Sequence, residues 1–252
     1  MFKVQLNDEV TVDASGTSDG TQVKYYQDGY WYKIDMLGNE GEVEYLCSGI
    51  LKFSTLKKSE FVVYERGLIN DKNGCRSKNF LKGEETFITF NRLHKNIYGI
   101  PMHEKINRLN SLEEKIEYVK YFVQSICNID VTDYLKKTFT LDFIILNEDR
   151  HFNNLGIVMK ADGSYRTAPI FDNGKSLLNG NYSVKRNMPI AENVKRVISR
   201  PFGGTHIKVM KYLGKGFDID FDSAVEWLEK QADSYSKEVL KYQIKEFEKI
   251  MK

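Results

Sequence analysis

Residues 147–154 read Asn-Glu-Asp-Arg-His-Phe-Asn-Asn and form a polar stretch between two apolar ones. The apolar end of a predicted helix, Leu141–Leu146, precedes this stretch, and Leu-Gly-Ile-Val-Met at residues 155–159 follows it. A polar loop that is held from both sides by buried elements presents its side chains at a fixed place, as functional loops do. The loop is therefore the first candidate for the chemistry of the protein.

A predicted hairpin brings a second polar group to this loop. A strand is expected over Gly156–Met159, a turn at Asp162-Gly163, and a second strand that leads into Ala-Pro-Ile-Phe-Asp-Asn-Gly at residues 168–174. Because paired antiparallel strands begin and end beside each other, Asn154 and Asp172 are expected to lie side by side and to share a cation.

Two spacings in these segments are typical of phosphoryl transfer from ATP. Asp149 and Asn154 are five residues apart, like the Asp and Asn of the kinase catalytic loop, and Asp172 stands where a kinase has its metal-binding Asp. The reaction needs metal ions on the phosphates and a carboxylate that orients the acceptor hydroxyl. Mg²⁺ takes oxygen ligands and keeps several waters, so one amide and one carboxylate besides ATP are enough.

The first ninety or so residues predict a mostly antiparallel sheet with one helix. Two aromatic-rich runs meet at Asp28-Gly29, the dipeptide of a tight hairpin turn. A helix is expected over Glu42–Leu51, where Val43, Leu46 and Ile50 fall on one face. A polar stretch rich in Asn, Lys and Gly separates the last two of the expected strands, which are Thr21–Gln27, Tyr30–Met36, Phe61–Tyr64 and Glu85–Phe90.

After Phe90 the apolar residues recur at helical spacing. Ser111 and Glu114 form a capping box at the start of one helix, and others are expected over Thr132–Leu146 and at the C-terminus. Strands first and helices second predict an α+β fold with two lobes and a cleft between them. The expected N-lobe covers residues 1–92, and the mostly helical C-lobe covers residues 93–252.

Composition and charge disfavour several classes of protein. The chain has 37 Lys and Arg against 35 Asp and Glu and no long run of one sign, so we expect neither nucleic acid nor membrane as a partner. The Lys and Arg of the C-terminal third are interpreted as solvated helix faces with acidic residues interspersed. Three scattered cysteines disfavour disulfides and structural zinc. Without a visible signal peptide we expect a cytoplasmic protein, and translocation by another route stays open.

The polar loop and the following aspartate together resemble a known family. Asn-x-Asp-x-His-x-x-Asn at 147–154, followed by Ala-Pro-x-x-Asp at 168–172, is similar to the HipA-like serine/threonine kinases, in particular the short kinases of the CtkA type. The Asp-Arg-His-x-x-Asn part is also similar to phosphatidylinositol 3- and 4-kinases.

This resemblance implies ATP and Mg²⁺ as cofactors and gives each residue of the loop a role. Asp149 is implied to be the catalytic base or the residue that orients the acceptor, and Asn154 and Asp172 are implied to bind Mg²⁺. Asn147 and His151 are implied to support the loop, and we expect His151 to donate to a nearby carboxylate or carbonyl.

The resemblance also points to nucleotide-binding residues in the N-terminal half. Lys33 resembles the strand lysine that reaches the α- and β-phosphates of ATP, and Glu44 resembles its ion-pair partner, with Glu42 as the second choice. Ser15-Gly16-Thr17-Ser18 resembles the family's Ser/Gly loop, whose backbone donors cradle phosphates, and we expect autophosphorylation within Ser15–Thr21. Thr89-Phe90-Asn91 resembles the hinge strand whose backbone meets adenine.

The resemblance implies two kinds of partner. One is a protein substrate, which the sequence does not identify. The other is an antitoxin or another regulatory protein, since the resemblance gives this chain the role of a toxin or an effector. Full-length HipA toxins have an additional N-terminal subdomain that the residues before 13 are too few to form, so a partner that docks there is not carried over. Two alternatives stay open, a phosphoinositide kinase and a nucleotide-binding module without turnover. The absence of a basic or amphipathic segment beside the cleft disfavours the first, and the intact set Lys33, Asp149, Asn154 and Asp172 disfavours the second.

Overall fold

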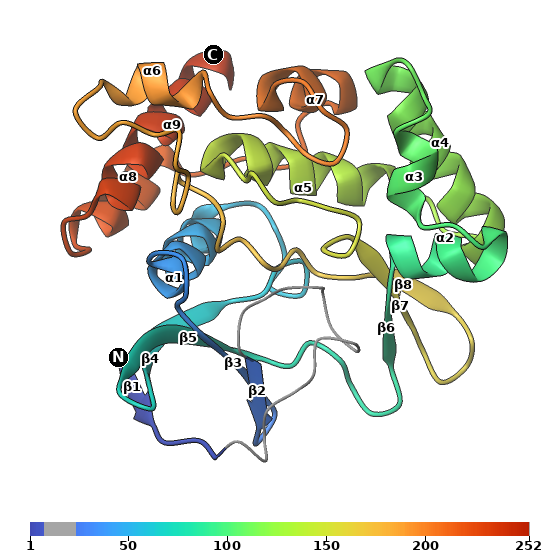
Figure 1. Ribbon diagram of the computed structural model, residues 1–252, viewed down its shortest axis with the longest axis horizontal. Coiled ribbons are helices and arrows are strands. Elements are labelled where there is room, and N and C mark those ends of the chain that lie inside the picture. Colours follow the sequence, from blue (N-terminus) through green and yellow to red (C-terminus); the bar gives the residue numbers. More distant parts are fainter. Residues whose placement is uncertain (8–23, 252) are drawn as a thin grey trace.

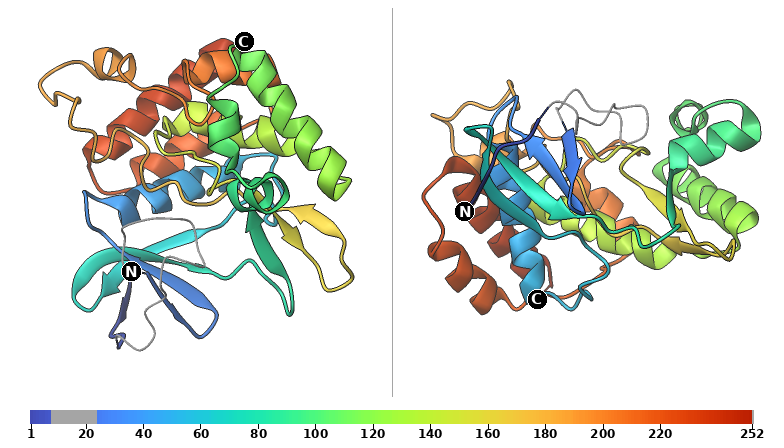
Figure 2. Two further views of the ribbon diagram at one scale, coloured as in Figure 1. Left: turned by 45° about the vertical axis from the view of Figure 1, so that its right-hand side comes forward. Right: turned by 90° about the horizontal axis from the view of Figure 1, so that it is seen from below.

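The computed structural model describes residues 1–7 and 24–251, so the predicted Ser/Gly loop, Ser15 to Ser18, lies outside the described residues. A five-stranded sheet with one helix packed on it forms the lower part of the molecule in Figure 1, and a larger group of helices forms the upper part. The left view of Figure 2 shows the same division from another side. The predicted two-lobed α+β arrangement, with strands first and helices second, is confirmed.

The first sheet contains the predicted hairpin. Strands β2 and β3 run antiparallel, and Asp28 and Gly29 at the turn between them have φ angles of 52° and 76°. Left-handed conformations at both positions are what a two-residue hairpin of this twist requires, and Asp-Gly adopts them readily. The order of strands is β1-β4-β5-β3-β2, with β1 at Phe2–Val4, β2 at Lys24–Gln27, β3 at Tyr30–Ile34, β4 at Tyr64–Ile69 and β5 at Lys72–Lys78.

The central strand of this sheet, β5, is missing from the sequence prediction. It reads Lys-Asn-Gly-Cys-Arg-Ser-Lys and lies within the polar stretch that was assigned to no strand. Its Cys75 and Ser77 are buried, while polar side chains such as Arg76 lie on the other face. Buried and exposed positions therefore alternate, but the buried side chains are not hydrophobic enough to mark a strand in the sequence. The strand expected over Phe61–Tyr64 begins only at Tyr64, and Phe61 forms an isolated bridge to Ile170 instead.

Helix α1 spans Glu40–Ile50, two residues earlier than expected at its start, and lies directly against β5. A side chain on Gly41 would place its Cβ 2.5 Å from the carbonyl carbon of Gly74, so the helix approaches the strand this closely because Gly41 has no side chain. The predicted buried face is confirmed, with Val43, Leu46 and Ile50 all in the core. Helix α1 also reaches β3, because Glu44 forms an ion pair with Lys33.

A second, three-stranded sheet contains the predicted hairpin after the polar loop. Strand β7, Gly156–Met159, pairs with β8, Tyr165–Thr167, and the turn between them contains Gly163 with a φ of 79°. Strand β6, Thr86–Thr89, pairs with β7 and not with the first sheet. The chain therefore passes from the first sheet to the second within residues 79–85, ahead of the predicted lobe boundary at 92.

The helical part is built around α5, Thr132–Ile145, which runs through its centre with α7 and α9 packed against it (Figure 1). The predicted capping box is present at the start of α4, where Ser111 and Glu114 bond to each other's backbone N–H groups. Within the described ranges, 1–7 and 24–251, no helix is both long and apolar enough to cross a membrane. The other helices are a 3₁₀ helix at Leu51–Phe53, α2 at Phe90–Tyr98, α3 at Met102–Ile106, α4 at Leu112–Cys127, α6 at Ile190–Val194, α7 at His206–Leu213, α8 at Phe221–Glu229 and α9 at Tyr235–Met251.

The link between β3 and α1 predicts a pH-dependent stability. Asp35 is half-buried there and accepts a hydrogen bond from the Gly41 N–H at 2.7 Å, and burial raises the pKa of its carboxyl from 3.8 to about 6. A carboxyl whose pKa is raised by folding binds its proton more tightly in the folded state. Its contribution is therefore favourable when it is protonated and is lost as the pH rises from about 4 to about 6.

We expect the Asp35→Asn variant to become more stable than wild type as the pH rises through this window, because the variant buries no charge. The gain should be only about 1 kcal/mol at neutral pH, since water screens part of the Asp35 charge. Urea unfolding of both proteins at acidic and neutral pH measures the difference in free energy of unfolding. A difference that stays constant with pH would contradict the assignment.

Candidate active site

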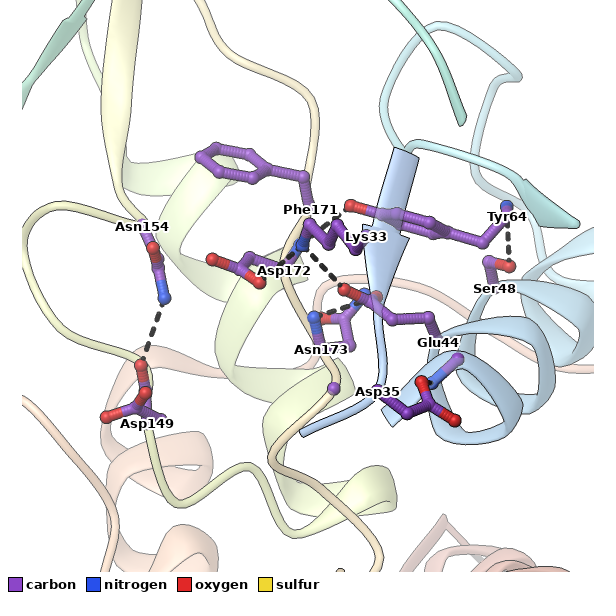
Figure 3. Close-up of polar contacts among 12 residues, drawn as sticks. Lys33, Asp35, Glu44, Ser48, Tyr64, Asp149, Asn154, Phe171, Asp172 and Asn173 are labelled. Carbon is purple, nitrogen blue, oxygen red and sulfur yellow. Dashed lines mark hydrogen bonds and ion pairs between the residues drawn. The ribbon is translucent and has the colours of Figure 1, made fainter. Parts of the chain in front are cut away.

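The polar loop after α5 is held in shape by hydrogen bonds within itself. The side-chain oxygen of Asn147 accepts from the Asp149 N–H at 2.9 Å, and the His151 N–H donates to the Asp149 carbonyl at 2.9 Å. Asn154 closes the loop, because its N–H donates to the His151 carbonyl at 2.8 Å and its side-chain amide donates to the Asp149 carbonyl at 3.1 Å (Figure 3). The four residues predicted to form the loop's chemistry are thus brought together.

Asn154 and Asp172 face the same space, as predicted from the hairpin. Figure 3 shows the Asn154 amide and the Asp172 carboxylate on opposite sides of one gap, each at the end of a segment that leads to or from the β7–β8 hairpin. The Oδ1 atom of Asn154 is buried and has no hydrogen-bond partner within the described part of the chain. A buried oxygen without a partner is costly unless something else binds it, and oxygen is the ligand that Mg²⁺ prefers. The two side chains therefore fit a magnesium ion.

Lys33 lies between two carboxylates, one from each part of the molecule. Its Nζ is 3.0 Å from Glu44 Oε1 of α1 and 2.6 Å from Asp172 Oδ1, as Figure 3 shows. The second oxygen of Glu44 accepts from the Asn173 N–H at 2.9 Å. Of the two residues predicted to pair with Lys33, Glu44 forms the ion pair, and its side chain is 1% exposed. Glu42 is half-buried and accepts a hydrogen bond from Asn39 instead.

The charges in this cluster change each other's proton affinity. Burial acts to lower the pKa of Lys33, but the carboxylates of Asp172 and Glu44 raise it well above its usual value. Burial acts to raise the pKa of Asp172, but the ammonium group of Lys33 holds it well below its usual range. Burial is the main reason why the pKa of Glu44 is raised. Opposite charges this close favour the ionised forms of Lys33 and Asp172.

Arg150 is fully buried beneath the loop, and the sequence analysis gave it no role. Its Nε and Nη2 bond to the carboxylate of Asp142 at 3.0 to 3.2 Å, and its Nη1 donates to the Phe171 carbonyl at 2.6 Å. Nη2 also donates to Asn173 Oδ1 at 2.7 Å, so one guanidinium ties the loop, α5 and the segment around Asp172 together. The signal for it was Asp142 within an apolar helix, since a buried carboxylate requires a partner.

Two histidines support the loop differently from the prediction. We expected His151 to donate to a nearby carboxylate or carbonyl, but its Nδ1 atom is buried without a hydrogen-bond partner among residues 1–7 and 24–251. His206, which the sequence placed in no site, donates from Nε2 to the Asn147 carbonyl at 2.8 Å. Burial lowers the pKa of His206, so its neutral form is favoured at this buried position.

A pocket opens between the β2–β3 hairpin and the segment that follows β5. Lys33 lines this pocket together with Phe87 of β6 and Phe171, which follows β8, so flat apolar surface lies next to a cation. Lys24, directly opposite Lys33 in the hairpin, places a second ammonium group at this pocket and was not predicted. The lining residues are Lys24, Trp31, Lys33, Val62, Tyr64, Ser77, Lys78, Asn79, Phe80, Leu81, Phe87 and Phe171.

The structure does not bring the predicted hinge, Thr89-Phe90-Asn91, to this pocket. The Phe90 N–H donates to the carbonyl of Leu155, just after the polar loop, and the Asn91 N–H donates to the carbonyl of Phe152 within it. Thr89 caps α2. Residues 78–81 line the pocket instead. The displacement follows from the undetected strand β5, because the segment that leaves the first sheet lies earlier in the chain than the sequence pattern indicated.

These features define the class of protein. A sheet with one helix, a buried Lys–Glu ion pair between them, and a helical lobe with an Asp-bearing loop beside a second Asp make up a protein-kinase-like fold. The crystal structure of the Helicobacter pylori proinflammatory kinase CtkA is similar over 90% of each chain, with a TM-score of 0.61 and 17% sequence identity. No protein-family model and no curated protein sequence matches the chain. The similarity shows the fold.

The buried Arg150–Asp142 pair generates a prediction on stability. Replacing Arg150 by Met leaves Asp142 as an uncompensated buried charge, which we expect to cost about 3 to 5 kcal/mol of unfolding free energy. Adding Asp142→Asn to Arg150→Met is expected to recover part of this loss, and Arg150→Lys tests whether charge alone suffices. Urea unfolding of the three variants measures the effect, and a loss below about 1 kcal/mol for Arg150→Met would refute it.

Proposed function

We propose that the protein is an ATP- and Mg²⁺-dependent serine/threonine protein kinase of the HipA-like type. The observation that carries the proposal is the ion-pair chain from Glu44 through Lys33 to Asp172, next to the closed loop that contains Asp149 and Asn154. Phosphoryl transfer depends on positioning and charge stabilisation, and these are the groups it needs. The resemblance to HipA-like kinases extends the proposal to autophosphorylation and to a toxin or effector role with a regulatory protein partner.

Each group in the site has a place in this reaction. Asn154 and Asp172 would hold Mg²⁺, which neutralises the charge of the phosphates when bound. Lys33 would turn from Asp172 toward the α- and β-phosphates while Glu44 keeps hold of it. Asp149 is 35% exposed, so its carboxylate can accept a hydrogen bond from the hydroxyl of an acceptor outside the cleft.

The proposal predicts loss of transfer in two single variants. With labelled γ-phosphate on ATP and Mg²⁺, we expect wild-type protein to label a protein acceptor or itself. Asp149→Asn and Asp172→Asn should lower the rate about 10²- to 10⁴-fold, because each removes a group that acts in the transition state. Asp162→Asn, in the β7–β8 turn, is the matched control and should retain the wild-type rate.

The acceptors in this assay are the protein itself, an acidic protein, a basic protein and phosphoinositide vesicles. Phosphate transfer at the wild-type rate in Asp149→Asn or Asp172→Asn would refute the assignment of that residue to the active site. Labelled lipid without labelled protein would establish the phosphoinositide kinase instead, and tight ATP binding without transfer to any acceptor would establish a binding module.

The partnerless oxygen of Asn154 generates a prediction on the metal alone. We expect Asn154→Ala to weaken Mn²⁺ binding in the presence of ADP by about 10-fold or more, because the variant loses one of two protein ligands. Electron paramagnetic resonance of free Mn²⁺ measures this without turnover. The neighbouring variant Asn153→Ala serves as the control, and equal Mn²⁺ affinity in the two variants would remove Asn154 from the metal site.

A further inference from the structure

A basic stretch of the chain leaves the active site and runs to α6. Residues 175–200 contain six Lys and Arg but one acidic residue, Glu192, although the whole chain is nearly balanced at a net charge of +2. This basic segment is mostly loop, with α6 as a five-residue helix, so it does not fit the predicted pattern of solvated helix faces with interspersed acids. All six side chains are exposed, namely Lys175, Lys185, Arg186, Lys195, Arg196 and Arg200.

Hydrogen bonds fix the basic segment against the loop that contains Asp149. The Glu148 N–H donates to the Lys175 carbonyl at 3.1 Å, and the side-chain amide of Asn181 donates to Glu148 Oε1 at 2.5 Å. From the other end of the segment, Arg200 Nη1 lies 4.0 Å from Asp149 Oδ1. The two ends of the segment therefore lie next to the residue that would face the acceptor hydroxyl.

Charges from both ends of the basic segment affect the pKa of Glu148. Burial raises this pKa, and the Asn181 hydrogen bond and the charges of Arg200 and Lys175 act in the opposite direction. Both cations are thus close enough to act on the loop beside Asp149, and they belong to opposite ends of the basic segment. An anionic group that approaches Asp149 enters the field of these cations.

Most cations of the basic segment have no carboxylate partner among the described residues. Across the described ranges, Lys175, Lys185, Arg186 and Arg196 have no carboxylate within 4.0 Å, although Lys195 pairs with Glu192. The Arg186 guanidinium lies 5.6 Å from the Tyr235 ring, and Arg196 donates to the Ser183 carbonyl at 3.5 Å. By contrast, Lys137 in α5 bonds to both Glu60 and Asp133. Clustered positive charge that the protein leaves uncompensated is suited to an anionic partner.

We infer that the acceptor is an acidic peptide segment, a Ser or Thr flanked by Asp and Glu residues, and that the basic segment recognises these carboxylates. This inference rests on the proposed kinase function. A peptide suits the surface better than a lipid bilayer does, since insertion into a bilayer needs a continuous apolar face beside the cations. The large apolar side chains that the segment exposes are Tyr182 and Ile198, far apart in its sequence.

Synthetic peptides with one Ser acceptor test the inference. Three peptides carry Glu, Ala or Lys at the positions around the same Ser, and kcat/KM is measured for each with saturating ATP and Mg²⁺. We expect the Glu peptide to exceed the Ala peptide by about 10-fold or more, and the Lys peptide to be the poorest. The advantage of the Glu peptide should shrink as NaCl rises from about 50 mM to about 300 mM, because salt screens exposed charges.

Charge reversal identifies the surface. The double variant Lys185→Glu/Arg186→Glu should lower kcat/KM for the Glu peptide about 10-fold and leave that of the Ala peptide and the KM for ATP unchanged. Lys57→Glu/Lys58→Glu, another adjacent exposed pair, lies in the loop before β4 and is the matched control. The control should behave as wild type with all three peptides.

Each outcome separates this inference from the proposed function. Equal phosphorylation of the Glu, Ala and Lys peptides would overturn the inference and leave the kinase function standing. Loss of the Glu preference in both double variants would move recognition away from the basic segment and overturn it as well. Transfer to phosphoinositide vesicles with no transfer to any peptide would replace the peptide with a lipid acceptor. No transfer to any acceptor would end the proposed function itself.

Discussion

The ammonium group of Lys33 is the point on which the arrangement of the two lobes depends. It is 11% exposed and bonds to one carboxylate from α1 and one from the segment after the β7–β8 hairpin. A buried ion pair contributes little net stability, because desolvation offsets much of the attraction, but removing one partner leaves an uncompensated charge. The three groups therefore fix the relative position of the lobes more than they stabilise the fold.

This cluster requires α1 to lie unusually close to the sheet. Gly41 permits that approach, and Asp35 and Glu40 satisfy backbone N–H groups where the chain turns from β3 into the helix. On the opposite side Arg150 holds the Asp172 segment from below through the carbonyl of Phe171. Lys33 and Asp172 are thus each positioned by a separate set of contacts within the protein.

The sequence predicted those parts of the fold and site that depend on local patterns. The Asp28-Gly29 turn, the Ser111 capping box and the β7–β8 hairpin all follow from short-range chemistry, and the structure contains them. The pairing of Lys33 with Glu44 came from the resemblance, and the geometry agrees with it. What the sequence missed depends on tertiary context: a polar central strand whose burial comes from its neighbours, and a guanidinium whose partners lie on three segments. Thr89, Phe90 and Asn91 lie outside the pocket lined by Lys33, and the segment that directly follows this strand lines it.

The contact between Lys33 and Asp172 also affects whether the binding of a metal ion would be coupled to the release of a proton. A carboxyl must lose its proton before it can coordinate a cation, and for a group with a raised pKa that loss couples metal uptake to pH. Here the lysine keeps the pKa of Asp172 well below its usual range, so the carboxylate stays ionised even at a pH where an ordinary aspartate begins to take up protons. The ammonium group of Lys33 neutralises this carboxylate within the protein. A cation that bound at Asp172 would take over that role, and its binding would not require a proton to leave Asp172.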